Sequence, residues 1–131
     1  MDKNIIYILL IAGAIALVFF KGTLFGSSNV KSINSAEAKE LIKKGKVELI
    51  DVRTPAEVSA GYIKGTKIFA DYMGNDFKAK TAKLDKSKTY LVYCKSGGRS
   101  AKASSELTAA GFTNIINLSG GISSWDGEIS K

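Results

Sequence analysis

The single cysteine of the chain, Cys94, stands in the stretch YCKSGGRSAK, with two glycines and Arg99 shortly after it. Glycines allow a loop to turn so that successive backbone N–H groups point inward and form a nest for an anion. A helix that begins near Arg99 would add the positive end of its dipole. Surroundings of this kind lower the pKa of a cysteine thiol, which is about 8.5 in free solution. These residues therefore favour a cysteine that acts as a sulfur nucleophile near neutral pH.

The residue types that are missing narrow the chemistry further. The 131 residues include no histidine, so Ser-His-Asp and Cys-His mechanisms are excluded and another group must activate the thiol. One cysteine cannot form a disulfide within the chain, and without histidine it argues against a metal site. We expect neither a metal nor a cofactor. The competing interpretation is a cysteine that only packs in the core, as lone cysteines often do. The order of strand, cysteine, glycine loop, arginine and helix favours the nucleophile.

The segments that follow residue 32 alternate between helical and strand patterns. Helices are predicted at 34–45, 54–61, 73–84 and 99–111, a short helical turn at 120–128, and strands at 47–52, 66–70, 89–94 and 113–118. The strands are apolar without alternation, as in a sheet that is covered on both faces. We therefore predict an α/β domain of three layers, in which a central, mostly parallel sheet of about five strands has helices on both faces. Cys94 ends a strand, at the sheet edge where the active sites of such folds lie.

The stretch IIYILLIAGAIALVFF, from Ile5 to Phe20, carries no charge. Extended to Phe25, it reaches the roughly 20 apolar residues that a spanning helix needs, provided that Lys21 extends its amine to the headgroups. We predict a transmembrane anchor at 1–25, a polar linker at 26–32 and a globular domain at 33–131. A cleaved signal peptide is one alternative, but its small-residue cleavage pattern is poor. A buried core helix is the other, but the segment is apolar all round.

The charges that flank this stretch are nearly balanced. Asp2 and Lys3 precede it, and Lys21 and Lys31 follow it, so the positive-inside rule gives little direction. A signal-like start with a very short N-terminal tail favours a domain outside the cytoplasm, in the periplasm. The cytoplasmic side of the membrane is the alternative.

The chain as a whole is basic. Its net charge is +7 at pH 7, and without the first 26 residues 17 basic minus 11 acidic residues leave +6. The simplest interpretation is a solvated surface that is rich in lysine. Only two arginines, and no basic run mixed with aromatic residues, argue against nucleic acid binding. The excess is compatible with attraction of small anionic substrates or of an anionic membrane surface.

Three stretches together resemble the single-domain rhodaneses, a family of sulfurtransferases. The first, LIDVRTPAEVSAGYIKGT, is similar to the family's Asp-Val-Arg strand end with its Pro-x-Glu and Gly-His-Ile-x-Gly-Ala patterns. The second, YLVYCKSGGRS, is similar to the family's Cys-x-x-Gly-x-Arg-Ser loop. The third, AAGFTNIINLSGGISSW, is similar to the family's ending, which runs from Gly-Phe to Gly-Gly and Trp. The resemblance covers about Ser32 to Glu128. Two departures stand out. Tyr62 occupies the position where the family usually has His, and we expect a structural rather than a catalytic role for it. Residues 67–80, which would help to shape the pocket rim, lack the family's Asn-x-Pro pattern.

This resemblance implies a rhodanese-like fold and a transfer of sulfane sulfur in two steps. Cys94 would take sulfur from thiosulfate or a persulfide donor and deliver it, as a persulfide, to a thiophilic acceptor such as a thiol or cyanide. The six residues after Cys94 would form the substrate-binding loop: Lys95, Ser96, Gly97, Gly98, Arg99 and Ser100. Their backbone amides would hold the terminal sulfur, while Arg99 braces the loop and Lys95 meets the anionic donor at the rim. We expect no cofactor and no nucleic acid partner.

Other residues near the predicted site have a structural interpretation. Asp51 and Arg53 stand at a strand end and are expected to form an ion pair that supports the loop, rather than to act in catalysis. Glu57 is expected to pair with a basic group. The residues expected to pack the last turn against the sheet are Gly120, Gly121 and Trp125.

Two other functions are compatible with a cysteine in this setting. A persulfide carrier or binding module tethered to the membrane would use the same residues without turnover of its own. Cysteine-dependent phosphatases and arsenate reductases place five residues between cysteine and arginine, whereas four separate Cys94 from Arg99. The shorter loop makes a smaller cradle, which suits one sulfur atom better than a tetrahedral phosphate. We therefore expect a sulfurtransferase that acts on thiosulfate.

Overall fold

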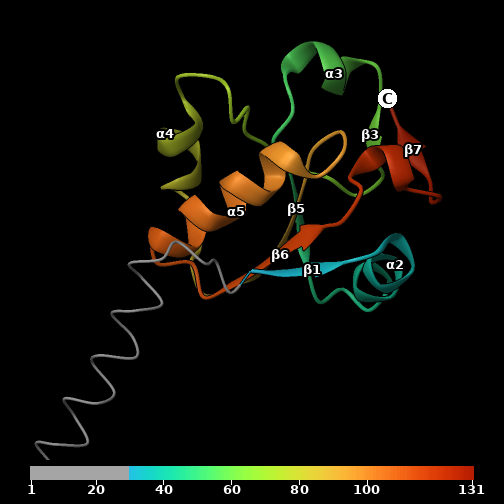
Figure 1. Cartoon of the computed structure of the whole chain (residues 1–131), viewed down its shortest axis with the longest axis horizontal. Coiled ribbons are helices and arrows are strands. Elements are labelled where there is room, and N and C mark those ends of the chain that lie inside the picture. Colours follow the sequence, from blue (N-terminus) through green and yellow to red (C-terminus); the bar gives the residue numbers. More distant parts are fainter. Residues whose placement is uncertain (1–29) are drawn as a thin grey trace, which may run out of the picture.

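The computed structural model describes residues 30–131 (Figure 1). Its helices are α2 (Ser35–Lys43), α3 (Pro55–Ser59), α4 (Phe77–Thr81), α5 (Gly98–Ala109) and the 3-10 helix η1 (Ile122–Ser124), and its strands are β1 (Lys31–Ile33), β2 (Glu48–Asp51), β3 (Tyr62–Ile63), β4 (Ile68–Phe69), β5 (Thr89–Tyr93), β6 (Asn114–Leu118) and β7 (Ile129–Ser130). The predicted anchor at 1–25 lies outside the described residues. Within residues 30–131, no helix has the length and apolar character needed to cross a bilayer.

Five strands form one parallel sheet in the order β1-β6-β5-β2-β4, which confirms the predicted α/β architecture. The central strand β5 pairs with β2 on one side and β6 on the other, so that Leu91 lies between Leu49 and Ile116. Because the strands are parallel, their N-terminal ends share one edge of the sheet and their carboxyl ends share the opposite edge. Cys94 directly follows β5 and therefore lies at the carboxyl edge.

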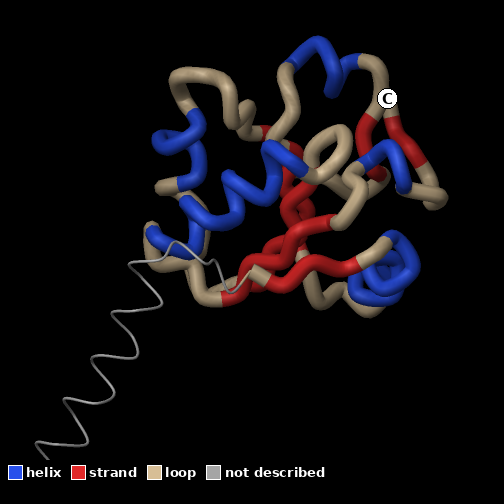
Figure 2. Tube along the Cα trace, in the orientation of Figure 1, coloured by secondary structure: helices blue, strands red, loops and turns tan. Residues whose placement is uncertain are grey.

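Helices cover both faces of the sheet (Figure 2). On one face, α4 and α5 cover an apolar cluster that includes Val92 and Leu107. On the other face, α2 covers a second cluster that includes Leu91 and Ala38. Full burial of a side chain such as leucine or valine contributes about 1.5–3 kcal/mol. Burial from both sides explains why the residues of β5 are apolar without alternation.

The ends of the first two helices follow the capping residues in the sequence. α3 begins with a capping box, in which Thr54 Oγ1 accepts a hydrogen bond from Glu57 N and the Glu57 carboxylate accepts one from Thr54 N. At α2, Asn34 Oδ1 accepts a hydrogen bond from Glu37 N at 2.9 Å. The chain leaves α2 through Gly45, whose φ of +67° is rarely adopted by residues with a side chain.

Three short strands are not among the predicted elements, and several predicted elements are shorter than expected: the strand at 66–70 is β4 and the helical turn at 120–128 is η1. β1 is not among the predicted elements, and it includes Lys31 and Ser32 of the predicted linker. β3 and β7 form an antiparallel pair of two residues each, and strands this short leave no periodic pattern to detect. The helix predicted at 73–84 is reduced to α4, because Met73 N donates to Asp71 Oδ1 in a turn that precedes it.

Candidate active site

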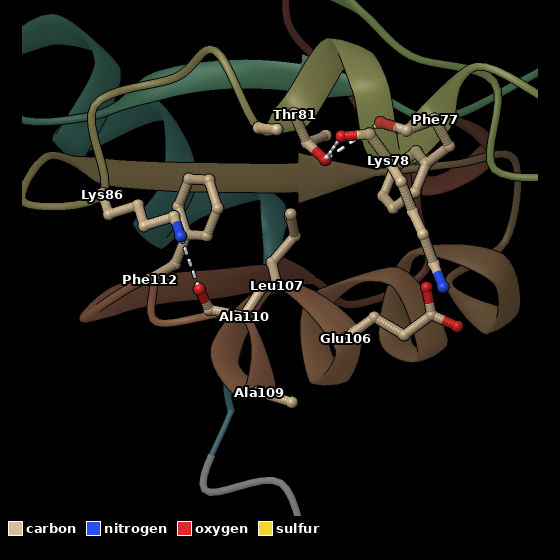
Figure 3. A pocket seen from close by; sticks show the side chains of 10 residues that line it. Phe77, Lys78, Thr81, Lys86, Glu106, Leu107, Ala109, Ala110 and Phe112 are labelled. Atoms are coloured by element: carbon tan, nitrogen blue, oxygen red, sulfur yellow. Dashed lines mark hydrogen bonds between the residues drawn. The ribbon is translucent and has the colours of Figure 1, made fainter.

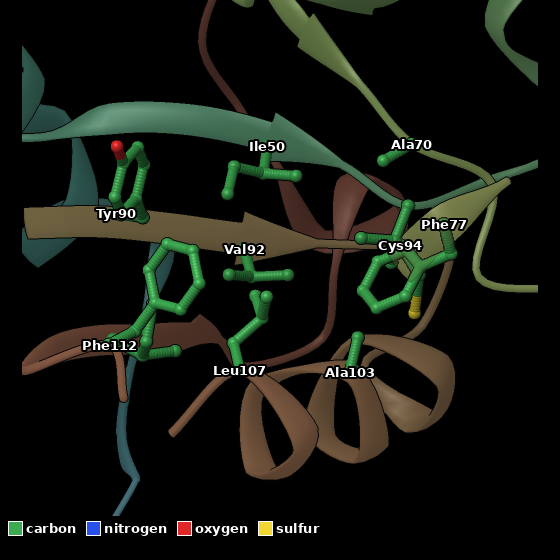
Figure 4. Packing of buried hydrophobic residues seen from close by; sticks show 11 residues of the cluster. Ile50, Ala70, Phe77, Tyr90, Val92, Cys94, Ala103, Leu107 and Phe112 are labelled. Carbon is green, nitrogen blue, oxygen red and sulfur yellow. The ribbon is translucent and has the colours of Figure 1, made fainter. Parts of the chain in front are cut away.

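Cys94 lies at the carboxyl end of β5 with its side chain almost fully buried. It is 1% exposed and belongs to the apolar cluster on the α5 face, together with Phe77 and Ala103. Figure 4 shows its sulfur pointing toward α5 beside the ring of Phe77. Burial alone favours the neutral thiol. The hydrogen bonds that reach the sulfur therefore decide whether it can ionise.

Two hydrogen bonds reach the sulfur from the glycine loop and from α5. The Gly97 N–H donates to Cys94 Sγ at 3.1 Å, and the Ser100 hydroxyl donates to it at 3.4 Å. Burial raises the pKa of the Cys94 thiol. The Ser100 hydroxyl and the backbone N–H groups of Ser100, Gly97 and Ser96 together lower it by more than burial raises it, so the pKa lies below its ordinary value. The arrangement stabilises a thiolate at this position.

The start of α5 places these donors beside the sulfur. Gly97, the residue before the helix, has a φ of +106°, which strains any residue with a side chain. α5 is 12 residues long, and the N–H groups of its first turn carry the positive end of the helix dipole. Negative charge on the sulfur is therefore favoured by the loop and by the helix together.

A second segment, η1, holds the cysteine loop from outside. The backbone N–H groups of Ile122 and Ser123 donate to the carbonyl oxygens of Cys94 and Lys95, both at 2.9 Å. Gly121 permits this approach, because a Cβ atom there would lie 2.5 Å from each of those oxygens. The sequence indicates packing at Gly121, and the structure identifies the cysteine loop as its partner.

Arg99, in the first turn of α5, is held by Glu57 of α3. Its Nη1 and Nη2 atoms donate to Glu57 Oε1 at 2.7 Å and Oε2 at 2.9 Å. This pair lowers the pKa of Glu57 to about 2; partial burial opposes the shift and the Thr54 cap assists it. The sequence predicts a basic partner for Glu57 and a bracing role for Arg99, and the structure brings these two residues together. Arg99 thus ties α5 to α3.

The predicted ion pair of Asp51 and Arg53 is present and supports α3. Arg53 Nη2 donates to Asp51 Oδ2 at 2.7 Å, Nε donates to Oδ1 at 3.0 Å, and both side chains are buried. Arg53 also donates to the carbonyl oxygens of Glu57 and Gly61, within α3 and just after it. The pair therefore positions the helix that carries Glu57. Its influence on the cysteine loop passes through the contact between Glu57 and Arg99.

The remaining predicted residues lie at the rim or in packed positions. Lys95, Ser96 and Gly98 are exposed on the solvent side of the loop. Tyr62 packs edge-on against Phe69, with ring centroids 5.1 Å apart. The predicted structural role of Tyr62 agrees with this contact.

A cavity of about 550 Å³ opens away from the cysteine loop, between α4 and the C-terminal half of α5 (Figure 3). Its lining includes Phe77, Leu107 and Phe112. No residue of the cysteine loop lines the cavity, although Phe77 belongs both to its lining and to the apolar cluster of Cys94. Among residues 30–131, no cluster of three or more His, Cys, Asp or Glu side chains is arranged to hold a metal ion.

Ser100→Ala should slow the reaction of Cys94 with iodoacetamide near neutral pH. The variant loses the hydroxyl that donates to the sulfur, so the pKa of Cys94 should rise and the thiolate fraction at pH 7 should fall. A fall of about threefold in the alkylation rate is expected for the loss of one such bond. Ser105→Ala is the matched control, because its hydroxyl donates to the Ala101 carbonyl on the same helix. An equal change in both variants would contradict the role of Ser100.

Glu57→Gln should reduce the free energy of unfolding by about 1–2 kcal/mol at pH 7, because the carboxylate that pairs with Arg99 is lost. The pKa of Glu57 is lowered on folding from 4.5 to about 2, so the pair stabilises the fold above pH 4.5. This contribution disappears as the pH falls toward 2. Urea unfolding should therefore separate the variant from the wild type at pH 7 and not at pH 2. Glu37→Gln, in the first turn of α2, is the control for removal of a carboxylate.

Comparisons with known proteins point in one direction. The model of the rhodanese-like domain family matches residues 34–128. The chain is 33% identical over 110 residues to "Thiosulfate sulfurtransferase 18" of Arabidopsis thaliana, covering 76% of this chain and 80% of that protein. It is 36% identical over 95 residues to "Probable adenylyltransferase/sulfurtransferase MoeZ" of Mycobacterium tuberculosis, covering 72% of this chain but only 24% of that protein, about a quarter of its length. A crystal structure of a rhodanese-like domain protein from Staphylococcus aureus is similar with a TM-score of 0.68 and 30% identity, covering 77% and 97% of the two chains.

Proposed function

The chain belongs to the rhodanese-like family of sulfurtransferases, and we propose that it transfers sulfane sulfur from thiosulfate through a persulfide on Cys94. Similar proteins that are named thiosulfate sulfurtransferases support a donor of this kind. The observation that carries the proposal is the Cys94 sulfur, which accepts hydrogen bonds from the Gly97 N–H and the Ser100 hydroxyl at the N-terminal end of α5. Donors fixed in this way stabilise negative charge on sulfur.

The proposed reaction has two steps. The Cys94 thiolate attacks the outer sulfur of thiosulfate, a new S–S bond forms, and the old S–S bond breaks so that sulfite leaves with its electron pair. A thiol, as its thiolate, or cyanide then takes the terminal sulfur from the Cys94 persulfide and restores the thiolate. The negative charge passes from Cys94 Sγ to the outer sulfur of the persulfide in the first step and returns to Sγ in the second. No general base is needed, which is compatible with a chain that has no histidine.

The contacts of Arg99 favour sulfur over phosphate as the transferred group. Both terminal nitrogens of its guanidinium bind the Glu57 carboxylate. A phosphate-binding arginine uses these nitrogens for two phosphate oxygens. Phosphate binding would therefore require Arg99 to leave Glu57, whereas a single sulfur atom needs only the loop and the start of α5.

Treatment with thiosulfate tests the proposal. The purified protein should gain the mass of one sulfur atom, and cyanide should remove that mass and form thiocyanate over repeated turnovers. A mass gain without turnover toward either cyanide or a thiol would instead indicate a persulfide carrier. Release of phosphate from an aryl phosphate, without cleavage of thiosulfate, would overturn the proposal in favour of a phosphatase.

A membrane location is a second part of the proposal. We propose that residues 1–25 anchor the protein with its domain outside the cytoplasm, in the periplasm. The support is the stretch from Ile5 to Phe20, which carries no charge. A C-terminal reporter enzyme that works only outside the cytoplasm should be active on the full chain. An expressed but inactive reporter would place the domain on the cytoplasmic side.

A further inference from the structure

The N-terminal edge of the sheet carries lysines that the proposed reaction does not use. They stand at the start of β1 and in the segments that lead into β2 and β5: Lys31, Lys43, Lys44, Lys46, Lys86 and Lys88, called the basal lysines below. All of them are exposed. Because the strands are parallel, these segments lie at one edge of the sheet. Cys94 lies at the other edge, about 15 Å away along β5.

Few carboxylates accompany the basal lysines. Glu48 and Asp85 lie in the same segments; Lys88 binds Glu48 at 3.2 Å, and Asp85 accepts hydrogen bonds from Ser87. Six lysines and two carboxylates leave an excess of four positive charges at this edge. Lys86 donates to the Ala110 carbonyl at the C-terminal end of α5. Within residues 30–131, the basal lysines without a carboxylate in salt-bridge distance are Lys31, Lys43, Lys44, Lys46 and Lys86.

The sequence of the predicted anchor joins the domain near this edge. Val30 directly precedes β1, and only residues 26–29 separate it from Phe25, where the predicted anchor ends. A stretch of this length spans at most about 15–20 Å. Figure 1 shows the start of β1 at the lower side of the domain and the cysteine loop, between β5 and α5, on the upper side. A membrane surface that holds the predicted anchor therefore lies within reach of the basal lysines.

We propose that the basal lysines dock the domain onto the anionic phospholipid surface of a membrane, with Cys94 facing away from the bilayer. Lysine ammonium groups act as point charges and need no fixed partner geometry, which suits a fluid layer of headgroups. Both arginines of the described chain, Arg53 and Arg99, are engaged by carboxylates near the opposite edge. No exposed aromatic side chain accompanies the basal lysines within residues 30–131, so the stacking that single-stranded nucleic acids use is missing.

Docking in this orientation has a consequence for the proposed reaction. The direction of the parallel strands would point the cysteine loop into the aqueous phase. Small anionic donors and soluble thiols could then reach Lys95 and Cys94 without crossing the repulsive field of the anionic headgroups. The proposal goes beyond the sulfur transfer itself, because it concerns the opposite edge of the sheet.

Lysine labelling on the full-length protein tests the docking. The protein is mixed with neutral phosphatidylcholine vesicles, or with vesicles that also contain phosphatidylglycerol, and treated briefly with an amine-reactive reagent before peptide mass spectrometry. Labelling of Lys43, Lys44 and Lys46 should be about threefold lower on the anionic vesicles, while Lys95 and Lys102 label equally on both. The protection should vanish in 1 M salt, where the screening length is about 3 Å.

Matched variants distinguish binding at the basal lysines from a general effect of the protein's net charge. The triple variant Lys43→Gln, Lys44→Gln, Lys46→Gln should lose the protection of Lys86 on anionic vesicles. The triple variant Lys67→Gln, Lys102→Gln, Lys131→Gln loses the same charge elsewhere and should keep the protection. Equal labelling on both lipids, or protection centred on Lys95, would overturn the proposal.

Flotation and activity assays separate the docking from the other proposals. If the protein floats with anionic vesicles but not with neutral ones, the result would support docking and contradict the anchor at 1–25. Protection by RNA without any protection by anionic vesicles would assign the basal lysines to nucleic acid and overturn the proposal. Thiosulfate cleavage in the absence of vesicles measures the sulfur transfer separately, so its failure and the failure of docking remain distinguishable.

Discussion

Cys94→Ser should abolish sulfur transfer while the protein stays folded. A serine hydroxyl does not ionise near neutral pH and cannot carry a persulfide, so the variant should gain no sulfur mass after thiosulfate treatment. Thiocyanate formation should fall by about 10⁴-fold or more, as expected when the nucleophile of an enzyme is removed. Intact-protein mass spectrometry and a colorimetric thiocyanate assay measure the two effects.

The stability of the same variant separates chemistry from packing. η1 holds the cysteine loop through the backbone, and the Gly97 N–H can donate to a serine oxygen as it does to sulfur. We therefore expect the free energy of unfolding to change by about 1 kcal/mol. Cys94→Ala provides a second inactive variant without a new buried hydroxyl. Thiosulfate turnover near the wild-type rate in either variant would show that the mechanism through Cys94 is wrong.

The sequence predicted those parts of the fold and of the site that are formed by residues close together in the chain. β5, the glycine loop and α5 are contiguous, so a strand pattern, two glycines and a helical pattern place Cys94 at the carboxyl edge of a parallel sheet. The capping box of Thr54 and Glu57 spans three residues and predicts the start of α3. In both cases the interacting groups are close in the chain, and the backbone conformation that joins them follows from residue type.

Contacts between segments that are far apart in the chain could not be predicted from local sequence patterns. Glu57 and Arg99 are 42 residues apart, and each has an expected structural role without an identified partner. Gly121 contacts the carbonyl of Cys94, although the only local signal is a pair of consecutive glycines, which indicates a close backbone approach but not to which segment. The order of the strands decides which loops meet at the carboxyl edge. That order depends on packing of the whole domain and not on local periodicity.

Gly121→Ala should cause the second large loss of activity, although Gly121 has no side chain that could contact the sulfur. Its added Cβ would lie 2.5 Å from the carbonyl oxygens of Cys94 and Lys95. Both are backbone atoms, so no side chain can rotate to relieve the collision and the loop must shift. A displacement of about 1 Å at a catalytic group can cost about 100-fold in rate. We expect that loss of turnover, and a free energy of unfolding lower by about 3 kcal/mol in urea titrations.

Gly45→Ala is the reference for alanine at a positive φ without a collision. Gly45 has a φ of +67°, and no atom lies within 4 Å of its Cβ position. Gly121 combines a φ of +58° with a ψ of −157°, a conformation that is almost restricted to glycine. Alanine at Gly45 should cost about 1 kcal/mol from the left-handed backbone alone and leave thiosulfate turnover unchanged. The further cost in stability at Gly121 contains both its more restricted backbone conformation and the collision with the cysteine loop, so the loss of turnover is the measure of the contact between η1 and the loop. If Gly121→Ala were no more destabilising than Gly45→Ala and kept full turnover, η1 would not brace the loop, and the bonds from Gly97 and Ser100 would hold the sulfur site without it.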